Sequence, residues 1–266
     1  MTPTGWLDRD GLRLAVHDAG GTGLPVVFQH GLCGDARQVA EVFPPDPAFR
    51  RVLLECRGHG ASDAGEEFSI ARFAADVAAL AETLPGPVVL GGISMGAAIA
   101  LRLAVTRPDL VSHLILVRPA WGVGDVPPGN LAPNVEVGML LARLGVDEAR
   151  EAFLASEMAA RLRVEAPDNI ASLTGFFGRE PVAQTAVLLM ALSREGLGVS
   201  ADQVAGLRVP VLVCGTAEDA IHPVGLARDM AAGIPGARYV NLPPKGRDKA
   251  AHLAALHKAI SGFLTE

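Results

Sequence analysis

Short, almost uninterrupted runs of aliphatic residues alternate along this chain with longer segments that have helical periodicity. Strands covered by helices on both faces have this apolar character, because neither face meets water. The runs that we expect to form strands are residues 12–17, 25–29, 52–55, 87–91, 113–117, 209–214 and 238–242. Strand–helix alternation with short connections predicts an α/β fold, a doubly wound, mostly parallel sheet flanked by helices.

One region interrupts the alternation. Between about residues 119 and 206 there is no convincing strand pattern, and helical segments are expected at 137–144, 147–162, 170–177 and 181–194. A helical insertion between two strands of a parallel sheet lies beyond the strand ends, where ligands bind. We therefore expect a core built from residues 1–118 and 207–266, and a helical lid formed by residues 119–206.

Composition narrows the class of protein. A chain of 266 residues, half of them apolar, can fill one core, and its net charge of −6 comes with scattered Lys and Arg. This pattern argues against nucleic-acid and membrane partners. Cys33, Cys56 and Cys214 fit neither a disulfide framework nor a metal site, and the first residues do not resemble a secretion signal. We expect a cytoplasmic protein that acts on a small molecule; the sequence leaves monomer and homodimer open.

The strongest chemical signal is the pentapeptide Gly92-Ile93-Ser94-Met95-Gly96, which follows an apolar run and opens a helix. A segment of this form turns sharply from strand to helix and exposes the serine Oγ. The two glycines are needed because side chains would clash in so tight a turn. The start of the helix adds oriented N–H groups near developing negative charge. Ser94 is therefore the candidate nucleophile.

At this point the sequence resembles the α/β-hydrolase family over nearly its whole length. The segment His30-Gly31-Leu32-Cys33-Gly34 matches the oxyanion loop of that family. The resemblance implies that the backbone N–H groups of Leu32 and Met95 together hold the oxyanion, which requires two donors aimed at one point. A plain turn at His30-Gly31 is the alternative interpretation.

A second family segment is Arg57-Gly58-His59-Gly60-Ala61-Ser62. The resemblance implies a mainly structural role for this segment, a turn packed beneath the site. The sequence departs from the family pattern at Glu55, where Asp is usual. We therefore predict that His59 is a structural histidine.

The acidic member of a catalytic triad should follow the next-to-last strand. There the sequence from Gly215 to Pro223 resembles a family signature that places the carboxylate at Asp219. In a triad this carboxylate accepts the Nδ1 proton of the histidine and stabilises the imidazolium. Glu218 is a weaker candidate, and the alternative role for Asp219 is to cap the next helix.

The catalytic base has several candidates in the sequence. Arg247 stands where the family pattern has histidine, and a guanidinium cannot act as a base. His252 follows five residues later and could reach the site through a longer loop. His222 lies so close to Asp219 that we expect it to cap or pack its own turn, and His257 should face away from His252. By elimination we predict His252 as the base, or else a site without a working triad.

These residues predict a serine hydrolase that forms an acyl-enzyme on a small, largely apolar ester or lactone, without metal or organic cofactor. Trp121 and Leu141 of the lid are expected to contact the substrate, although Trp121 could equally pack at the hinge. A thioesterase, a C–C hydrolase and a perhydrolase of the same family remain open. So does a ligand-binding protein on the same fold, in which Arg247 marks a lost histidine.

Overall fold

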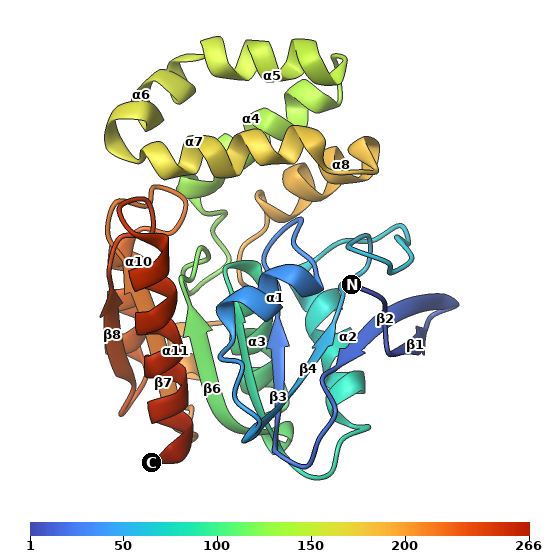
Figure 1. The fold of residues 1–266 in the computed structure, drawn as a ribbon, viewed down its shortest axis with the longest axis vertical. Coiled ribbons are helices and arrows are strands. Elements are labelled where there is room, and N and C mark those ends of the chain that lie inside the picture. The colour runs from blue at the N-terminus through green and yellow to red at the C-terminus, as the bar shows by residue number, and fades with distance from the viewer.

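The computed structural model describes residues 1–266 and contains one eight-stranded sheet (Figure 1). The strands are β1 (Gly5–Arg9), β2 (Leu12–Asp18), β3 (Leu24–Gln29), β4 (Phe49–Leu54), β5 (Val88–Ile93), β6 (Val111–Val117), β7 (Val211–Thr216) and β8 (Arg238–Leu242). Their order is β1-β2-β4-β3-β5-β6-β7-β8. The β1–β2 and β2–β4 pairs are antiparallel and all others are parallel. The predicted α/β fold is confirmed.

Helices cover both faces of the sheet. They are α1 (Ala36–Val42), α2 (Ile70–Ala81), α3 (Met95–Thr106), α10 (Val224–Gly233) and α11 (Lys249–Thr265), with a short 3₁₀ turn, η1 (Pro108–Leu110), before β6. Successive strand residues point to opposite faces, so Val26 and Phe28 pack with α1 and α11, whereas Val27 packs with α2, α3 and α10. This double burial explains the continuous apolar runs.

A helical insertion joins β6 to β7, as predicted. Its elements are η2 (Gly129–Leu131), α4 (Ala132–Leu141), α5 (Val146–Ala155), α6 (Glu157–Glu165), α7 (Pro167–Thr174), η3 (Gly175–Gly178), α8 (Val182–Leu192) and α9 (Ala201–Ala205). We call α4 to α8 the cap; it lies over one end of the sheet (Figure 1). The single helix expected at 147–162 is two helices, because Ser156 has extended backbone and its side chain caps α6 by accepting the Ala159 N–H.

The connections define where a ligand can lie. From β3 the chain passes through α1 to β4, and then returns through α2 to β5 on the other side of β3. Loops that leave β3 and β5 therefore diverge at the carboxyl ends of these strands, and open α/β sheets bind ligands in the resulting crevice. The oxyanion loop and Ser94 both lie there. None of the helices has the length and apolar character that crossing a membrane requires.

Candidate active site

Ser94 lies at the bend between β5 and α3, with a φ of +58°. Its backbone occupies a region that L-residues seldom adopt, which is typical of a strained turn that presents a nucleophile. A Cβ on Gly92 would lie 2.4 Å from the backbone of Gly96, and a Cβ on Gly96 would lie 2.3 Å from the Gln29 carbonyl oxygen. The predicted strand–turn–helix context, and the need for both glycines, are confirmed.

The loop after β3 passes directly against the nucleophile. A Cβ on Gly31 would lie 3.4 Å from the Ser94 Cβ, and the Gly31 N–H donates to Gln38 Oε1 over 2.7 Å, which fixes the loop. The Leu32 N–H has no backbone acceptor, and the Met95 N–H, the first of α3, has none within the helix. Both expected oxyanion donors are thus free beside Ser94.

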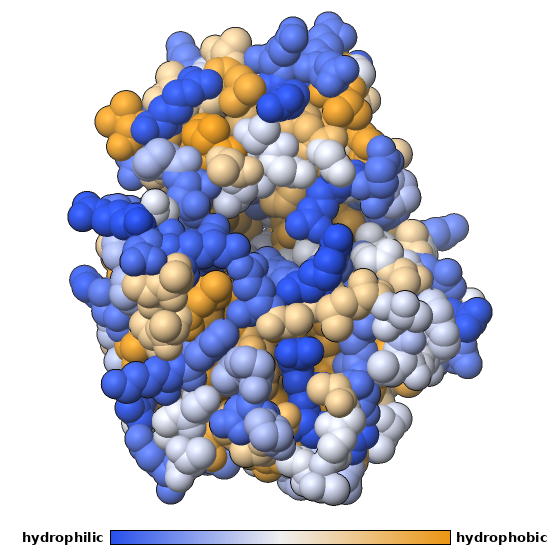
Figure 2. Space-filling view, viewed as in Figure 1, coloured by the Kyte–Doolittle hydropathy of each residue, from blue (hydrophilic) through white to orange (hydrophobic).

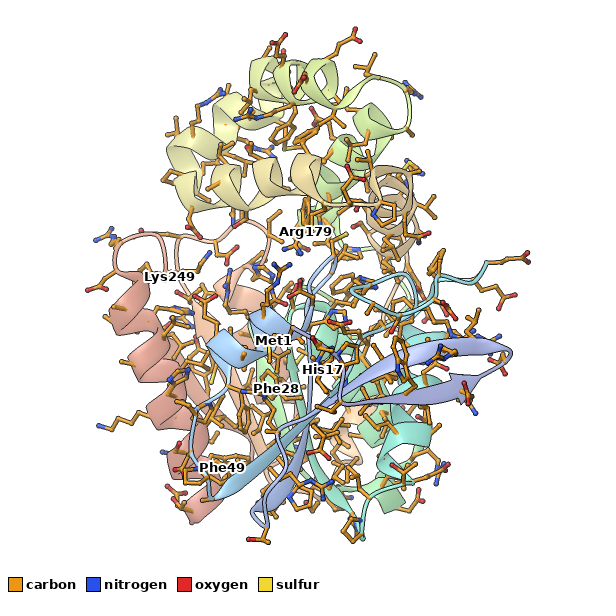
Figure 3. The ribbon with its side chains drawn as sticks, turned by 45° about the vertical axis from the view of Figure 1, so that its right-hand side comes forward. Met1, His17, Phe28, Phe49, Arg179 and Lys249 are labelled. Carbon is orange, nitrogen blue, oxygen red and sulfur yellow. The ribbon has the colours of Figure 1, made fainter.

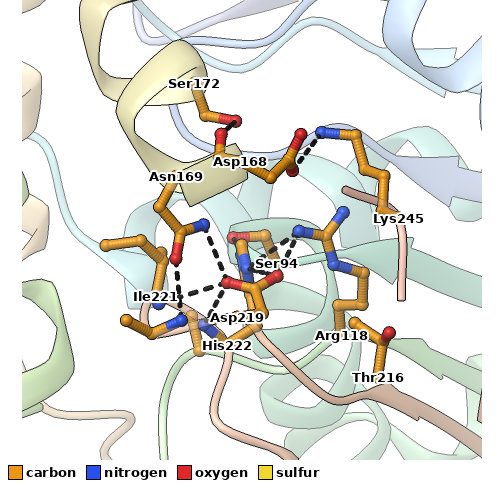
Figure 4. Close-up of polar contacts among 12 residues, drawn as sticks. Ser94, Arg118, Asp168, Asn169, Ser172, Thr216, Asp219, Ile221, His222 and Lys245 are labelled. Carbon is orange, nitrogen blue, oxygen red and sulfur yellow. Dashed lines mark hydrogen bonds and ion pairs between the residues drawn. The ribbon is translucent and has the colours of Figure 1, made fainter. Parts of the chain in front are cut away.

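An imidazole faces Ser94, but it belongs to His222. Its Nε2 lies 2.8 Å from Ser94 Oγ, and its Nδ1 lies 2.9 Å from Asp219 Oδ2 (Figure 4). Asp219 Oδ1 accepts the backbone N–H groups of Ile221 and His222 over 3.2 and 3.0 Å. This turn directs the ring of His222 back toward the carboxylate and the serine.

The expected approach of His252 to Ser94 is not what the structure shows. The His252 side chain is buried, and its Nδ1 lies 2.8 Å from the carbonyl oxygen of Pro243. The reason is that Asp248 caps α11 directly before Lys249, so His252 is held in the first turns of a packed helix. Arg247 is exposed and its Nε donates to Glu218 over 2.8 Å. His222, which we expected only to cap or pack its own turn, occupies the predicted position of His252.

The His222–Asp219 pair is buried and includes a third charge, Arg118. Burial lowers the pKa of His222; Asp219 opposes this shift and Arg118 adds to it. Burial alone would raise the pKa of Asp219, but the neighbouring His222 and Arg118, with a hydrogen bond from Asn169, hold that pKa well below its usual range. Near neutral pH the site therefore contains a charged carboxylate and a neutral imidazole.

Two hydrogen-bonding patterns are open to His222 Nδ1. It can donate to Asp219 Oδ2 at 2.9 Å, or accept from Arg118 Nη2 at 3.2 Å. The shorter contact, to a full negative charge, favours the proton on Nδ1, because hydrogen bonds to charged groups are the stronger ones. The lone pair of Nε2 then faces the Ser94 hydroxyl, as a general base requires.

Asn169, which the sequence did not single out, links the cap to this pair. Its Nδ2 donates to Asp219 Oδ1 over 3.0 Å, and its Oδ1 accepts the Ala220 N–H over 2.7 Å. Both groups of the amide are thus used to hold the acid loop. A single Asn within a helix carries no sequence signal for such a contact.

The two lid residues expected to contact substrate lie elsewhere. Trp121 is only 1% exposed, and its Nε1 donates to the Glu195 carbonyl oxygen over 3.1 Å, which ties together the two ends of the insertion. Leu141 is buried in the main hydrophobic core. Both expectations are corrected, and for Trp121 the structure selects the hinge-packing alternative.

The histidines of the two loops under the site are structural, as predicted for His59. His59 Nε2 accepts the Cys33 N–H over 3.0 Å and its Nδ1 donates to the Arg57 carbonyl oxygen. Glu55 accepts the backbone N–H groups of Ala36 and Ala61, at 3.0 and 2.7 Å. The glutamate in the place of the usual aspartate therefore joins α1 to the turn beneath the oxyanion loop.

Two connected hollows lie between the cap and the core, where Figure 2 shows hydrophilic residues around a depression. The inner cavity, about 220 Å³, is lined by Ser94, His222, the cations Arg118, Arg179 and Lys245, five amide, hydroxyl or glycine residues, and the apolar Leu32, Ile93, Leu173, Phe176 and Ile221. The outer cleft, about 930 Å³, shares Gln38 and Arg179 with it. Arg179 extends from the cap toward the core (Figure 3).

The lining is more polar than the largely apolar substrate expected from the sequence would need. Only five of its fifteen residues are hydrophobic, since most of the large apolar side chains of the cap pack into the core. No group of three or more His, Cys, Asp or Glu side chains is placed to hold a metal ion. The cavity instead presents the Ser94 hydroxyl, the His222 imidazole and three cationic side chains.

Comparisons with known proteins identify the family of the chain. The family described as alpha/beta hydrolase fold matches residues 25–248. "Putative non-heme bromoperoxidase BpoC" of Mycobacterium tuberculosis is 30% identical over 239 residues, covering 86% of this chain and 89% of the relative. A thermophilic esterase from Thermogutta terrifontis has a TM-score of 0.69 at 25% identity, covering 99% of this chain and 94% of that one.

An enol-lactonase from Burkholderia xenovorans has a TM-score of 0.73 at 24% identity, covering 98% of this chain and 100% of the other; at this identity the likeness concerns the fold alone. The family match spans most of the chain and includes the loops that carry Leu32, Ser94, Asp219 and His222. The chain belongs to the alpha/beta hydrolase fold family.

Proposed function

We propose that this protein is a serine hydrolase that cleaves a small ester or lactone through an acyl-enzyme, with Ser94, His222 and Asp219 as its triad. The observation that carries the proposal is the contact of 2.8 Å between His222 Nε2 and Ser94 Oγ, with Asp219 on the other ring nitrogen. This arrangement has the geometry that converts a serine hydroxyl into a nucleophile.

In this mechanism His222 takes the Ser94 proton as Oγ attacks the substrate carbonyl. The carbonyl oxygen gains negative charge and accepts the N–H groups of Leu32 and Met95, and Asp219 stabilises the imidazolium. The alcohol leaves with the proton from His222. Water then attacks the acyl group with the same histidine as base, and the acid and free Ser94 result. No metal or organic cofactor takes part in these steps.

Three features support a hydrolase with a small substrate over a non-catalytic binding protein. A ligand-binding protein without catalysis would need no imidazole on Ser94, and the argument for it depended on Arg247 having replaced the base. The inner cavity, about 220 Å³, is smaller than the roughly 300–1,000 Å³ usual for larger ligands, which favours a small substrate. The esterase among the structural relatives has the same fold over 99% of this chain.

A fluorophosphonate probe tests the proposal directly, because the Oγ of an activated serine attacks its phosphorus, displaces fluoride and becomes phosphonylated. We expect the wild-type protein to be labelled at Ser94, as located by peptide mass spectrometry, and Ser94→Ala to remain unlabelled. A wild-type protein that is folded by circular dichroism and yet inert to the probe would contradict the proposal.

A further inference from the structure

The charges that line the inner cavity are all positive. Arg118, Arg179 and Lys245 face it, and no Asp or Glu belongs to its lining. The outer cleft differs, since Asp35, Glu41, Glu55 and Glu180 are among its residues. The charged side chains that face the inner cavity are therefore cationic, and the carboxylates paired with Arg118 and Lys245, those of Asp219 and Asp168, are not part of its lining.

Arg118 is the most deeply placed of the three cations, only 8% exposed. It follows β6 directly with a φ of +46°, so the chain bends as it delivers the side chain to the site. Its Nη2 contacts Asp219 and His222, whereas its Nε is buried without a partner and Nη1 makes no hydrogen bond. The guanidinium therefore keeps an unused donor, Nη1, for an acceptor on a ligand in the cavity that Arg118 lines.

Lys245 and Arg179 complete the cationic lining from two other directions. Lys245 comes from the loop after β8, and its Nζ lies 2.9 Å from Asp168 of the cap (Figure 4). Arg179 follows η3, and its nearest carboxylate, that of Asp35, is 4.0 Å away. The core and the cap thus each bring positive charge to the same small cavity as Ser94.

Arg118 also affects the chemistry. The imidazolium that forms when His222 takes the serine proton lies beside a guanidinium, and two like charges at this distance repel each other. Asp219 offsets part of that repulsion. An anionic group on the substrate that binds Arg118 would offset the rest, and it would do so only when substrate is present.

From these observations we infer that the substrate carries a carboxylate, bound by Arg118 and Lys245, a few bonds from the carbonyl that Ser94 attacks. The planar fork of a guanidinium matches a carboxylate, and a lysine adds a point charge. The apolar side chains of Leu173, Phe176 and Ile221 would contact the carbon chain between the two groups. This inference rests on the proposed function for the identity of the attacked carbonyl.

Binding to Ser94→Ala separates recognition from catalysis. The two ligands are monomethyl succinate and methyl 4-methylpentanoate, in which an isopropyl group replaces the carboxylate. We expect isothermal titration calorimetry to show that the acid binds at least ~10-fold more tightly, as charged hydrogen bonds of about 1.5–3 kcal/mol imply. Equal affinity for the two esters would overturn the inference.

Further substitutions in the Ser94→Ala protein test whether Arg118 and Lys245 cause the tighter binding of the acid. Arg118→Met and Lys245→Met should each bring the two affinities to within about threefold, and Arg118→Lys should restore part of the difference. Arg247→Met removes an exposed cation outside the cavity and should keep the preference. A preference that survives both Arg118→Met and Lys245→Met would also overturn the inference.

The probe experiment keeps the two ideas distinct. If the probe labels Ser94 and the two esters bind equally, the proposed hydrolase stands and the inferred substrate carboxylate is wrong. If the acid binds more tightly but the probe does not label the protein, the cavity binds a carboxylate and the proposed hydrolase is wrong.

Discussion

His222 Nε2 lies 2.8 Å from Ser94 Oγ although 128 positions separate the two residues. Ser94 lies at the bend after β5 and His222 on the loop after β7, and β6 alone lies between these strands in the sheet. Because the strands are parallel, both loops leave the same edge. The topology of the sheet therefore brings the Ser94 hydroxyl and the His222 imidazole together.

The bend itself makes a first prediction. Gly96→Ala places a methyl group 2.3 Å from the Gln29 carbonyl oxygen, so α3 or β3 must shift, and we expect the free energy of unfolding to fall by about 1–3 kcal/mol. Probe labelling of Ser94 should fall as well. Gly225→Ala in α10 is the matched control, because no atom lies within 4 Å of its new Cβ, and it should leave stability within about 1 kcal/mol. Urea unfolding of the two variants measures the difference.

The success of the sequence at this bend and its failure at the base have a common cause. The bend around Ser94 is a local structure, because its strand, turn and helix are all determined by residues adjacent in the sequence. The base is defined by where a side chain points after two loops have folded. His252 followed a proline-containing loop that appeared long enough to reach Ser94, but Asp248 starts α11 before it and packing holds its ring on Pro243.

The sequence does contain a feature that points to His222 as the partner of Asp219. His222 lies three positions after Asp219, and an aspartate at this spacing can accept backbone N–H groups and the imidazole N–H at once, as Asp219 does. The cationic character of the cavity had no comparable signal. Arg118, Arg179 and Lys245 come from three segments far apart in sequence, and only the folded cap brings them together.

The pH dependence of the reaction follows from the environment of His222. The pKa of His222 lies below the ordinary 6.5, and the base works only when it is neutral. The acid limb of the kcat/KM profile should therefore have its midpoint below pH 6.5. Arg118→Met removes a positive charge that disfavours the imidazolium, and should move the acid limb to higher pH. Initial rates with a neutral ester from about pH 4 to 9 give the acid limb of the wild type and of Arg118→Met. A wild-type limb at or above pH 6.5 contradicts the assignment.

Stability should also depend on pH, through His59. Burial lowers its pKa from 6.5 to about 3, so between these values the unfolded chain binds a proton that the native protein does not. The stability contribution is complete above pH 6.5 and falls by about 1.4 kcal/mol per pH unit as the pH decreases toward 3. His59→Gln keeps an acceptor for the Cys33 N–H and does not titrate, so its unfolding free energy should decline less steeply. Parallel curves for the two proteins would refute this prediction.

The central claim is that His222 and not His252 activates Ser94. The direct test is kcat/KM of His222→Ala and of His252→Asn on one neutral methyl ester, with both variants shown to be folded by their thermal unfolding. Asn keeps a donor near the Pro243 carbonyl oxygen in place of His252 Nδ1. We predict a loss of about 10³-fold or more for His222→Ala and less than about tenfold for His252→Asn. A large loss in His252→Asn with activity retained in His222→Ala would contradict the account.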